Sequence, residues 1–148
     1  MVSRFTVTTQ SSAAPSELFD ISLDIEVHVA SMAGTRERAI DGVTDGRIRL
    51  GEEVTWRGRH LGVWFTMSSR VTELSRPRHF VDEQTSGPFR AFRHEHFFEA
   101  TPGGGCRMTD DITFASPIFG LLAERLILLP YLRRLIVKRN VELLRRVE

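Results

Sequence analysis

The C-terminal stretch Ser116–Glu148 constrains the fold more than any other part of the chain. Its first half is apolar almost without interruption, and its second half repeats leucine, isoleucine and valine at helical spacing between arginines. We expect Tyr131–Val147 to form one helix about 25 Å long, at ~1.5 Å per residue. A long helix with an apolar stripe must bury that stripe against another layer.

The chain before this stretch supplies that layer, because most of it alternates apolar and polar residues as strands do. After the first strand, Pro15–Ser22 is expected to be a short helix, and Asp24 can cap a second one, Ile25–Met32. Residues 25, 27 and 29 of that second segment also alternate as in a strand. The expected strands are Arg4–Thr9, Arg36–Asp41, Arg47–Arg57, Leu61–Leu74, His79–Thr85, Phe89–Ala100 and Cys106–Phe114.

Length and composition indicate one soluble domain, residues 1–148. A net charge of +1 gives no electrostatic reason to expect a nucleic-acid partner. A single cysteine, Cys106, excludes an internal disulfide, and the first residues lack the apolar core of a signal peptide. We therefore expect a cytoplasmic protein.

This order of elements resembles that of the START/Bet v 1-like (SRPBCC, helix-grip) superfamily, in particular its bacterial polyketide cyclase/dehydrase-like members. The segments that carry the resemblance are Ala14–Asp20, Phe80–Gln84, Gly87–Phe89, Phe92–Glu99, Gly104–Asp110 and the terminal helix. The resemblance implies an α+β fold in which a curved antiparallel sheet of about seven strands wraps around the long C-terminal helix. It also implies a ligand cavity between that helix and the sheet, with no cofactor. Fold alone does not fix function.

Alternation predicts which side chains of the last hairpin face the helix. Phe92, His94, His96 and Phe98 share one face, which carries no formal charge when the histidines are neutral. If Thr101–Gly105 is the loop, Ala100 pairs with Cys106 and His96 lies opposite Asp110. We therefore expect an inward His96–Asp110 pair.

The register of the preceding hairpin is open. A two-residue loop at Gly87-Pro88 would turn Glu83 inward, whereas one added or lost loop residue would turn Asp82 and Gln84 inward instead. In the strand Leu61–Leu74, we expect the set beginning Leu61, Val63, Phe65 and Met67 to face the helix.

The first functional hypothesis is binding of a small hydrophobic or amphipathic molecule, such as a lipid, polyketide or aromatic compound. Polar groups would orient one end of the ligand: His94, His96, Asp110 and Glu83. The apolar walls would be Phe65, Met67, Phe92, Phe98, Met108, Ile112, Phe114, Leu132, Ile136 and Leu143.

The second hypothesis is a cyclase or dehydratase in which His96 acts as acid–base and Asp110 orients it. The alternative is a structural role, in which the two side chains form a hydrogen bond with each other in a partly polar core. His94 and His96, with Asp110 or Glu83, have the pattern of a metal site, but no fourth ligand is evident and we expect no metal.

The third hypothesis is an interaction module. The segment Ile118–Leu132 is too apolar all round for a solvated helix, so it could close the cavity, touch a membrane transiently or form a homodimer face. Pro130 removes a backbone donor and is expected to kink or break the helix there.

Overall fold

The computed structural model describes residues 2–116 and 121–148. Seven strands form one antiparallel sheet in the order β1-β7-β6-β5-β4-β3-β2. The strands are β1 (Ser3–Ser11), β2 (Arg38–Gly42), β3 (Glu53–His60), β4 (Val63–Ser75), β5 (His79–Ser86), β6 (Ala91–Ala100) and β7 (Cys106–Ala115).

The helices lie in two places along the chain. Two short ones follow β1, namely α1 (Pro15–Ser22) and α2 (Ile25–Ser31), with a 3-10 turn η1 (Ala33–Thr35) after them. The C-terminal rod consists of α3 (Leu121–Ala123), a π-helical turn η2 (Glu124–Leu128) and α4 (Leu129–Val147). This is the α+β arrangement expected from the sequence.

Local chemistry explains the helix boundaries. Asp24 caps α2 because its side chain accepts hydrogen bonds from the backbone N–H groups of Glu26 and Val27. Pro130 was expected to kink or break the C-terminal helix, and it does not break it. Instead, the π-helical turn immediately before α4 takes up the irregularity that a proline without an N–H introduces.

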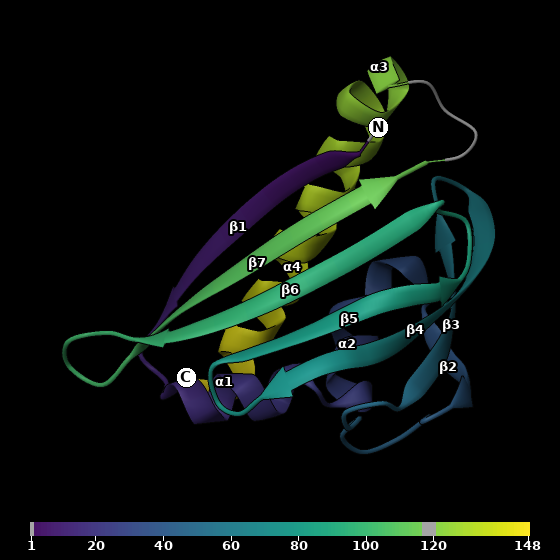
Figure 1. Cartoon of the computed structure of the whole chain (residues 1–148). Helices are drawn as coiled ribbons and strands as arrows, with labels where there is room; N and C mark the ends of the chain where they lie inside the picture. Colours follow the sequence, from purple (N-terminus) through teal and green to yellow (C-terminus); the bar gives the residue numbers. More distant parts are fainter. Residues whose placement is uncertain (1, 117–120) are drawn as a thin grey trace.

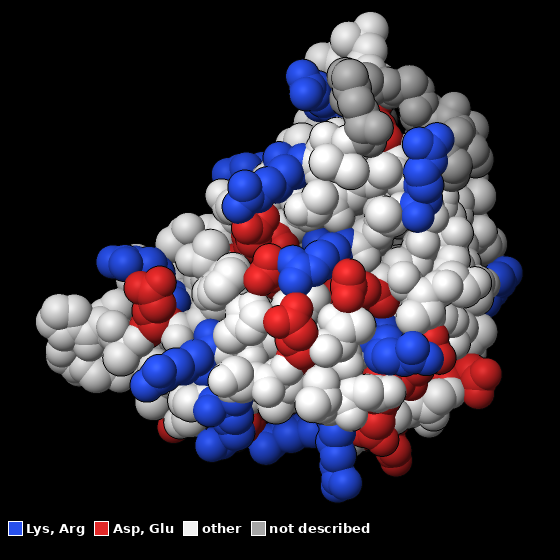
Figure 2. Space-filling view, viewed as in Figure 1, with Lys and Arg blue, Asp and Glu red and all other residues white. Residues whose placement is uncertain are grey.

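The sheet is strongly curved, and α4 crosses its concave side (Figure 1). The helix packs against β1, α1 and α2. Figures 1 and 2 share one view, from the outer side of the sheet, and acidic and basic side chains are interspersed on that side in Figure 2. Arg4 pairs there with Asp111, and Arg93 pairs with Glu73. Charge therefore marks the solvated face of the sheet.

The buried apolar residues form two clusters. The larger one lies around α1 and α2 and includes Phe19, Phe98, Met108 and Leu143. The smaller one consists of Phe5, Val7, Ile112, Phe114 and Ile136. On β6, β7 and α4 alike, polar residues separate the members of one cluster from those of the other. A polar layer therefore divides the core.

Two strand limits differ from expectation near β3. The strand begins at Glu53, beyond Gly51, whose φ of 83° is the left-handed conformation that glycine adopts most easily. The tight turn between β3 and β4 is Leu61-Gly62, not Gly58–His60, because β3 continues to His60 and pairs it with Val63. Both turn residues have positive φ, as a two-residue hairpin turn of the type I′ class requires.

Replacing Leu143, which is 1% exposed on α4, with alanine should lower the free energy of unfolding by roughly 2–5 kcal/mol, because the change leaves a cavity in the larger cluster. The matched control is Val141→Ala on the same helix, where the side chain is 47% exposed and the change should stay within about 0.5 kcal/mol. Urea unfolding measures both. Equal effects would mean that α4 does not dock on the sheet through Leu143.

Candidate functional site

The last hairpin has the predicted register. His96 lies opposite Asp110, Phe98 lies opposite Met108, and Ala100 lies opposite Cys106. The side chains of His94, His96 and Asp110 are all buried under α4. The expectation that this face of the hairpin points inward is therefore confirmed.

Asp110 is the centre of a hydrogen-bonded network. Its carboxylate has no exposed surface and accepts from three side chains. His94 Nε2 lies 2.7 Å from Oδ1, Arg139 Nη1 lies 3.0 Å from the same oxygen, and Asn140 Nδ2 lies 2.7 Å from Oδ2. Asn140 Nδ2 also donates to Thr9 Oγ1 at 3.0 Å, which extends the network to β1. The network thus joins β1, β6 and β7 to α4.

His96 has a different close partner from the one expected. Its Nε2 lies 2.7 Å from Asp82 Oδ2, while its Nδ1 is 3.5 Å from Asp110 Oδ1 and 3.5 Å from Arg139 Nη2. The short histidine–aspartate contacts are therefore His94–Asp110 and His96–Asp82. A proton on Nε2 of His96 fits this geometry, because Asp82 can only accept and Arg139 can only donate.

Burial and neighbouring charge fix the protonation states. Burial lowers the pKa of His96, and the charges of His94 and Arg139 add to the effect, so that the pKa falls to about 3 although Asp82 opposes the shift. Burial alone would raise the pKa of Asp110, but the Arg139 charge and the His94 hydrogen bond hold it well below its usual range. At neutral pH the layer therefore contains a neutral His96 and an ionised Asp110.

The prediction for Glu83 is wrong. The β5–β6 loop is longer than two residues, so that Glu83 pairs with Arg93 and Asp82 pairs with His94. Glu83 lies on the outer face, 3.6 Å from the Arg93 guanidinium. The alternative register, with Asp82 and Gln84 turned inward, is the one observed. A one-residue change in the loop exchanges the two faces of the strand.

The apolar residues expected to line the cavity divide into three groups. Phe98, Met108 and Leu143 belong to the larger packed cluster. A second group belongs to the smaller cluster or packs on it, namely Phe92, Ile112, Phe114, Leu132 and Ile136. Phe65 and Met67 lie on the inner face of β4, which carries the buried Val71 further along the strand. Phe65 is nevertheless 37% exposed, so this part of the concave face is not covered.

Arg139 and Asn140 were not anticipated as members of the site. Both residues belong to α4, and both are buried. The sequence contained a signal for them, because they fall midway between Ile136 and Leu143 on the apolar stripe. Polar residues within the apolar stripe of a helix predict polar partners on the sheet that the stripe covers.

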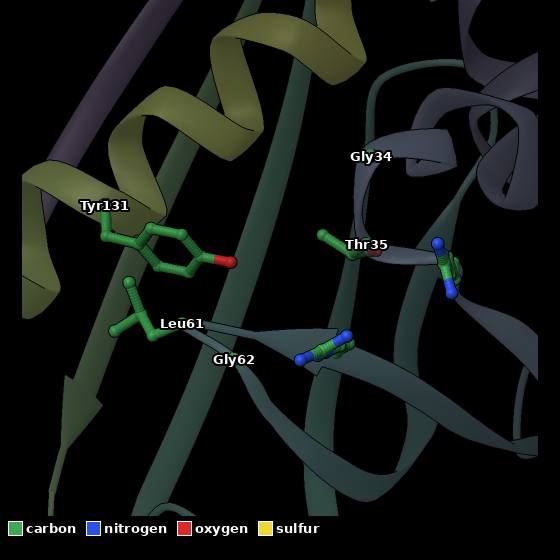
Figure 3. A pocket seen from close by; sticks show the side chains of 7 residues that line it. Gly34, Thr35, Leu61, Gly62 and Tyr131 are labelled. Atoms are coloured by element: carbon green, nitrogen blue, oxygen red, sulfur yellow. The ribbon is translucent and has the colours of Figure 1, made fainter.

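An open pocket lies at the end of the β3–β4 hairpin. It has a volume of about 370 Å³ and is lined by Gly34, Thr35, Arg36, Arg59, Leu61, Gly62 and Tyr131. Figure 3 shows the Tyr131 ring reaching from α4 across the pocket towards Thr35, with Leu61 and Gly62 on the hairpin beside it. A second hollow lies between α1 and the loop before β3, and its lining includes Phe19, Leu50 and Leu74.

A chain of polar contacts supports this pocket from behind. The Tyr131 hydroxyl lies 2.8 Å from His60 Nδ1, and His60 Nε2 lies 3.6 Å from Glu37. Glu37 is buried and also contacts His28 Nε2 at 2.6 Å. Burial would raise the pKa of Glu37, but the two histidines hold it well below its usual range. The sequence analysis did not identify any residue of this chain of contacts.

The candidate metal ligands come together only in part. Nitrogen or oxygen atoms of Asp82, His94 and His96 lie within 4.8 Å of one another. Both histidines already hold a carboxylate through Nε2, and the Arg139 cation lies 3.5 Å from His96. A cation so close disfavours a metal ion. The absence of a metal stays a prediction.

The apolar segment Ile118–Leu132 is seen in part, since residues 118–120 fall outside the described residues. Leu122, Leu126 and Ile127 are strongly exposed, whereas Leu128, Leu129 and Leu132 pack on the smaller cluster. Glu124 anchors the segment, because it is buried and accepts a hydrogen bond from Ser3 Oγ at 3.0 Å. Within the described residues, no helix is long and apolar enough to cross a membrane.

Solved structures share this architecture over nearly the whole chain. TTHA0849 from Thermus thermophilus is 16% identical with a TM-score of 0.79, covering 98% of this chain and 97% of its own. The Zhui aromatase/cyclase from Streptomyces sp. R1128 is 14% identical with a TM-score of 0.79, covering 99% and 94%. Ara h 8.0201 is 13% identical with a TM-score of 0.75, covering 99% and 98%.

The chain has the helix-grip fold that these solved structures share. No protein-family model matches the sequence, and no curated protein matches it. At these low identities the likeness establishes the helix-grip fold and transfers no site residue to this chain.

The depressed pKa of His96 makes stability depend on pH. In the unfolded chain His96 takes up a proton near its ordinary pKa of 6.5, whereas in the folded protein it stays neutral down to about 3. The contribution of His96 to the free energy of unfolding is therefore fully present above pH 6.5 and is lost as the pH falls. At pH 5 the loss should be about 2 kcal/mol. Urea unfolding at pH 7 and pH 5 measures it.

The comparison variant for this prediction is His96→Gln, which cannot titrate in this range. The variant should be less stable than the wild type at pH 7 because it perturbs the network, but its free energy of unfolding should fall less between pH 7 and pH 5. Equal pH dependence in the two proteins would show that His96 is not held neutral by burial.

Proposed function

We propose that this protein binds a small hydrophobic or amphipathic molecule in the uncovered part of the concave face, between α4 and the β3–β4 hairpin. The observation that carries the proposal is the exposure of apolar side chains on the inner face of the sheet. Phe65 is 37% exposed and Val63 is 54% exposed there, although both occupy inward positions of β4. Apolar surface left open inside a concave fold is typical of a ligand site.

The position of α4 supports this location. The helix packs against β1, α1 and α2, and its polar contacts go to β1 and the β6–β7 hairpin. Among the described residues, the β3–β4 hairpin forms one side-chain hydrogen bond with the helix, between His60 and Tyr131. A single contact of this kind can open to admit a ligand at a cost of about 1 kcal/mol.

The size of the opening fits a small molecule. The pocket of about 370 Å³ lies within the usual range of roughly 300–1,000 Å³ for ligand sites. Ring contacts lead inward from it, because His60 lies against both Tyr131 and Phe65, with ring centroids 5.9 and 6.3 Å apart. A ligand that enters beside Tyr131 would therefore meet Phe65 and then Met67.

A catalytic role for His96 and Asp110, as in an aromatase/cyclase or dehydratase, is the second candidate function. The support for it is the pair of short histidine–aspartate contacts, and one structural neighbour is described as an aromatase/cyclase. Against it, neither side chain lines the pocket beside Tyr131. Every buried side-chain polar atom among the described residues has a partner, so the network has no free group to offer a substrate.

We therefore assign the network a structural role and place the ligand beyond it. The third hypothesis, an interaction module, makes a different prediction. In that case the exposed residues Leu122, Leu126 and Ile127 would be buried against a protein partner. Native mass spectrometry of the purified protein, with organic extraction, separates these possibilities. A co-purifying small molecule supports binding, whereas a concentration-dependent dimer mass supports the interaction module.

Changing Phe65 to aspartate should weaken binding of N-phenyl-1-naphthylamine, an uncharged fluorescent probe, by about tenfold or more. The reason is that a carboxylate would be placed on the proposed apolar wall, where a bound ligand would desolvate it. Fluorescence titration measures the dissociation constant. The matched control is Ile40→Asp, which places the same charge at another exposed apolar residue, on β2, and should leave binding unchanged.

Two results would count against this location. If the wild type does not bind the probe, the concave face is not a ligand site. If Phe65→Asp and Ile40→Asp bind it as well as the wild type does, the ligand site lies elsewhere. Thermal unfolding of each variant confirms that both remain folded during the titration.

A further inference from the structure

We propose that the pocket beside Tyr131 is an anion site, in which Arg36 and Arg59 hold the carboxylate or phosphate end of an amphipathic ligand. The inference rests on the proposed function and adds to it the chemical class of the ligand. The apolar part of that ligand would lie inward, over Phe65, and its charged end would stay at the pocket rim.

The two arginines are available for a ligand. Both line the pocket, and within residues 2–116 and 121–148 neither forms an ion pair or a side-chain hydrogen bond. Arg4, Arg76 and Arg93 by contrast are each held by a carboxylate. Guanidinium groups that line a pocket favour carboxylate and phosphate, because the planar fork of donors of each group matches both anions.

The pocket contains no competing carboxylate. None of its seven lining residues is acidic. Glu37, which follows Arg36 in the chain, is buried and engaged by His28 and His60. Glu37 does not line the pocket, and the side chains that do are cationic, hydroxyl-bearing or apolar.

The backbone is strained where it forms this pocket. Within the described part of the chain, the non-glycine residues with positive φ are Arg36, at 54°, and Leu61, at 52°. Both line the pocket. A left-handed conformation is unfavourable for arginine and leucine, and residues held in this way cluster at binding sites. The strain at Arg36 places a cation at the rim, and the strain at Leu61 places an apolar side chain beside it.

Tyr131 supplies a neutral donor to the same site. Its hydroxyl reaches into the pocket in Figure 3 and is held by His60. Burial and the Glu37 charge both raise the pKa of Tyr131, so the phenol keeps its proton. The O–H can turn from His60 Nδ1 to a bound anion, which would release the contact between α4 and the β3–β4 hairpin. Anion binding and opening of the apolar face are thereby coupled.

The test compares two probes that differ by one sulfonate. 8-Anilino-1-naphthalenesulfonate carries the anion, and N-phenyl-1-naphthylamine has the same ring system without it. The variants are Arg36→Asn, since asparagine tolerates positive φ, and Arg59→Gln. Each should weaken binding of the sulfonate about fivefold or more, as expected for loss of a charge-assisted hydrogen bond, and change binding of the neutral probe less than about twofold.

The control variant is Arg38→Gln. Arg38 is exposed on β2, two residues from Arg36, and does not line the pocket. The substitution removes the same charge from the same region, so sulfonate binding should stay at the wild-type level. An equal loss in Arg38→Gln would show a general effect of positive charge and would overturn the site.

The outcomes separate this inference from the proposed function. Unchanged sulfonate binding in both pocket variants, with the neutral probe still bound, overturns the anion site and leaves the apolar site intact. Arginine-dependent sulfonate binding without any binding of the neutral probe supports the anion site and rejects the apolar site. If neither probe binds the wild type, both proposals fail.

Competition then distinguishes the sources of the anion. Laurate and dodecyl phosphate should each displace the sulfonate probe from the wild type, and the tighter competitor identifies carboxylate or phosphate as the preferred group. Inorganic phosphate at the same concentration should not displace it, because it lacks the apolar chain. Displacement by inorganic phosphate as effective as that by laurate would overturn the amphipathic ligand.

Discussion

The buried ion pair between Asp110 and Arg139 is the interaction on which the arrangement of helix and sheet depends. Asp110 has no exposed surface and Arg139 is 4% exposed, so each would be costly to bury alone. Together they lie 3.0 Å apart and are supported by His94 and Asn140. A directional contact of this kind fixes where α4 crosses β7 more precisely than apolar packing does, because apolar packing is non-directional.

The position of the helix decides which part of the concave face is covered. The ion pair and the Asn140–Thr9 hydrogen bond hold α4 on the side of β1 and β7. On β3 and β4, Val54 and Val71 pack in one cluster with Ile25 and Val27 of α2, but Phe65, nearer the hairpin turn, remains partly exposed. The fold is thus divided into a closed half, stabilised by the polar layer, and an open half at the β3–β4 hairpin.

The two halves use histidines differently. In the closed half, His94 and His96 stack on each other with ring centroids 3.7 Å apart, and each holds a carboxylate. In the open half, His60 links Tyr131 of the pocket to the buried Glu37. The first arrangement closes a layer of the core, whereas the second lies at the junction of two elements that share few contacts. This difference is why we locate binding at the second.

The sequence was sufficient for the fold and for part of the closed half. Alternation and the glycine-rich loop after Ala100 predicted the His96–Asp110 register, because a tight loop leaves few alternative pairings. Glu83 was placed on the wrong face, because a loop of uncertain length sets the register of β5. Arg139 was not anticipated as a site residue, although it falls on the apolar stripe of the helix between Ile136 and Leu143. The pocket beside Tyr131 could not be predicted in the same way, because its residues come from η1, the β3–β4 turn and the start of α4, which are distant in sequence. Periodicity places a residue on a face of its own element, but it does not say which ends of elements meet.

The most direct test of the division into a closed and an open half is the amide NMR spectrum of ¹⁵N-labelled protein, recorded with and without N-phenyl-1-naphthylamine. Our account predicts that the largest chemical-shift changes occur at Leu61, Phe65, Met67 and Tyr131, with little change at Asp110, Ile112 and Arg139. The opposite pattern, with the changes centred on Asp110 and Ile112, would place the ligand between α4 and the β6–β7 hairpin and would contradict the account.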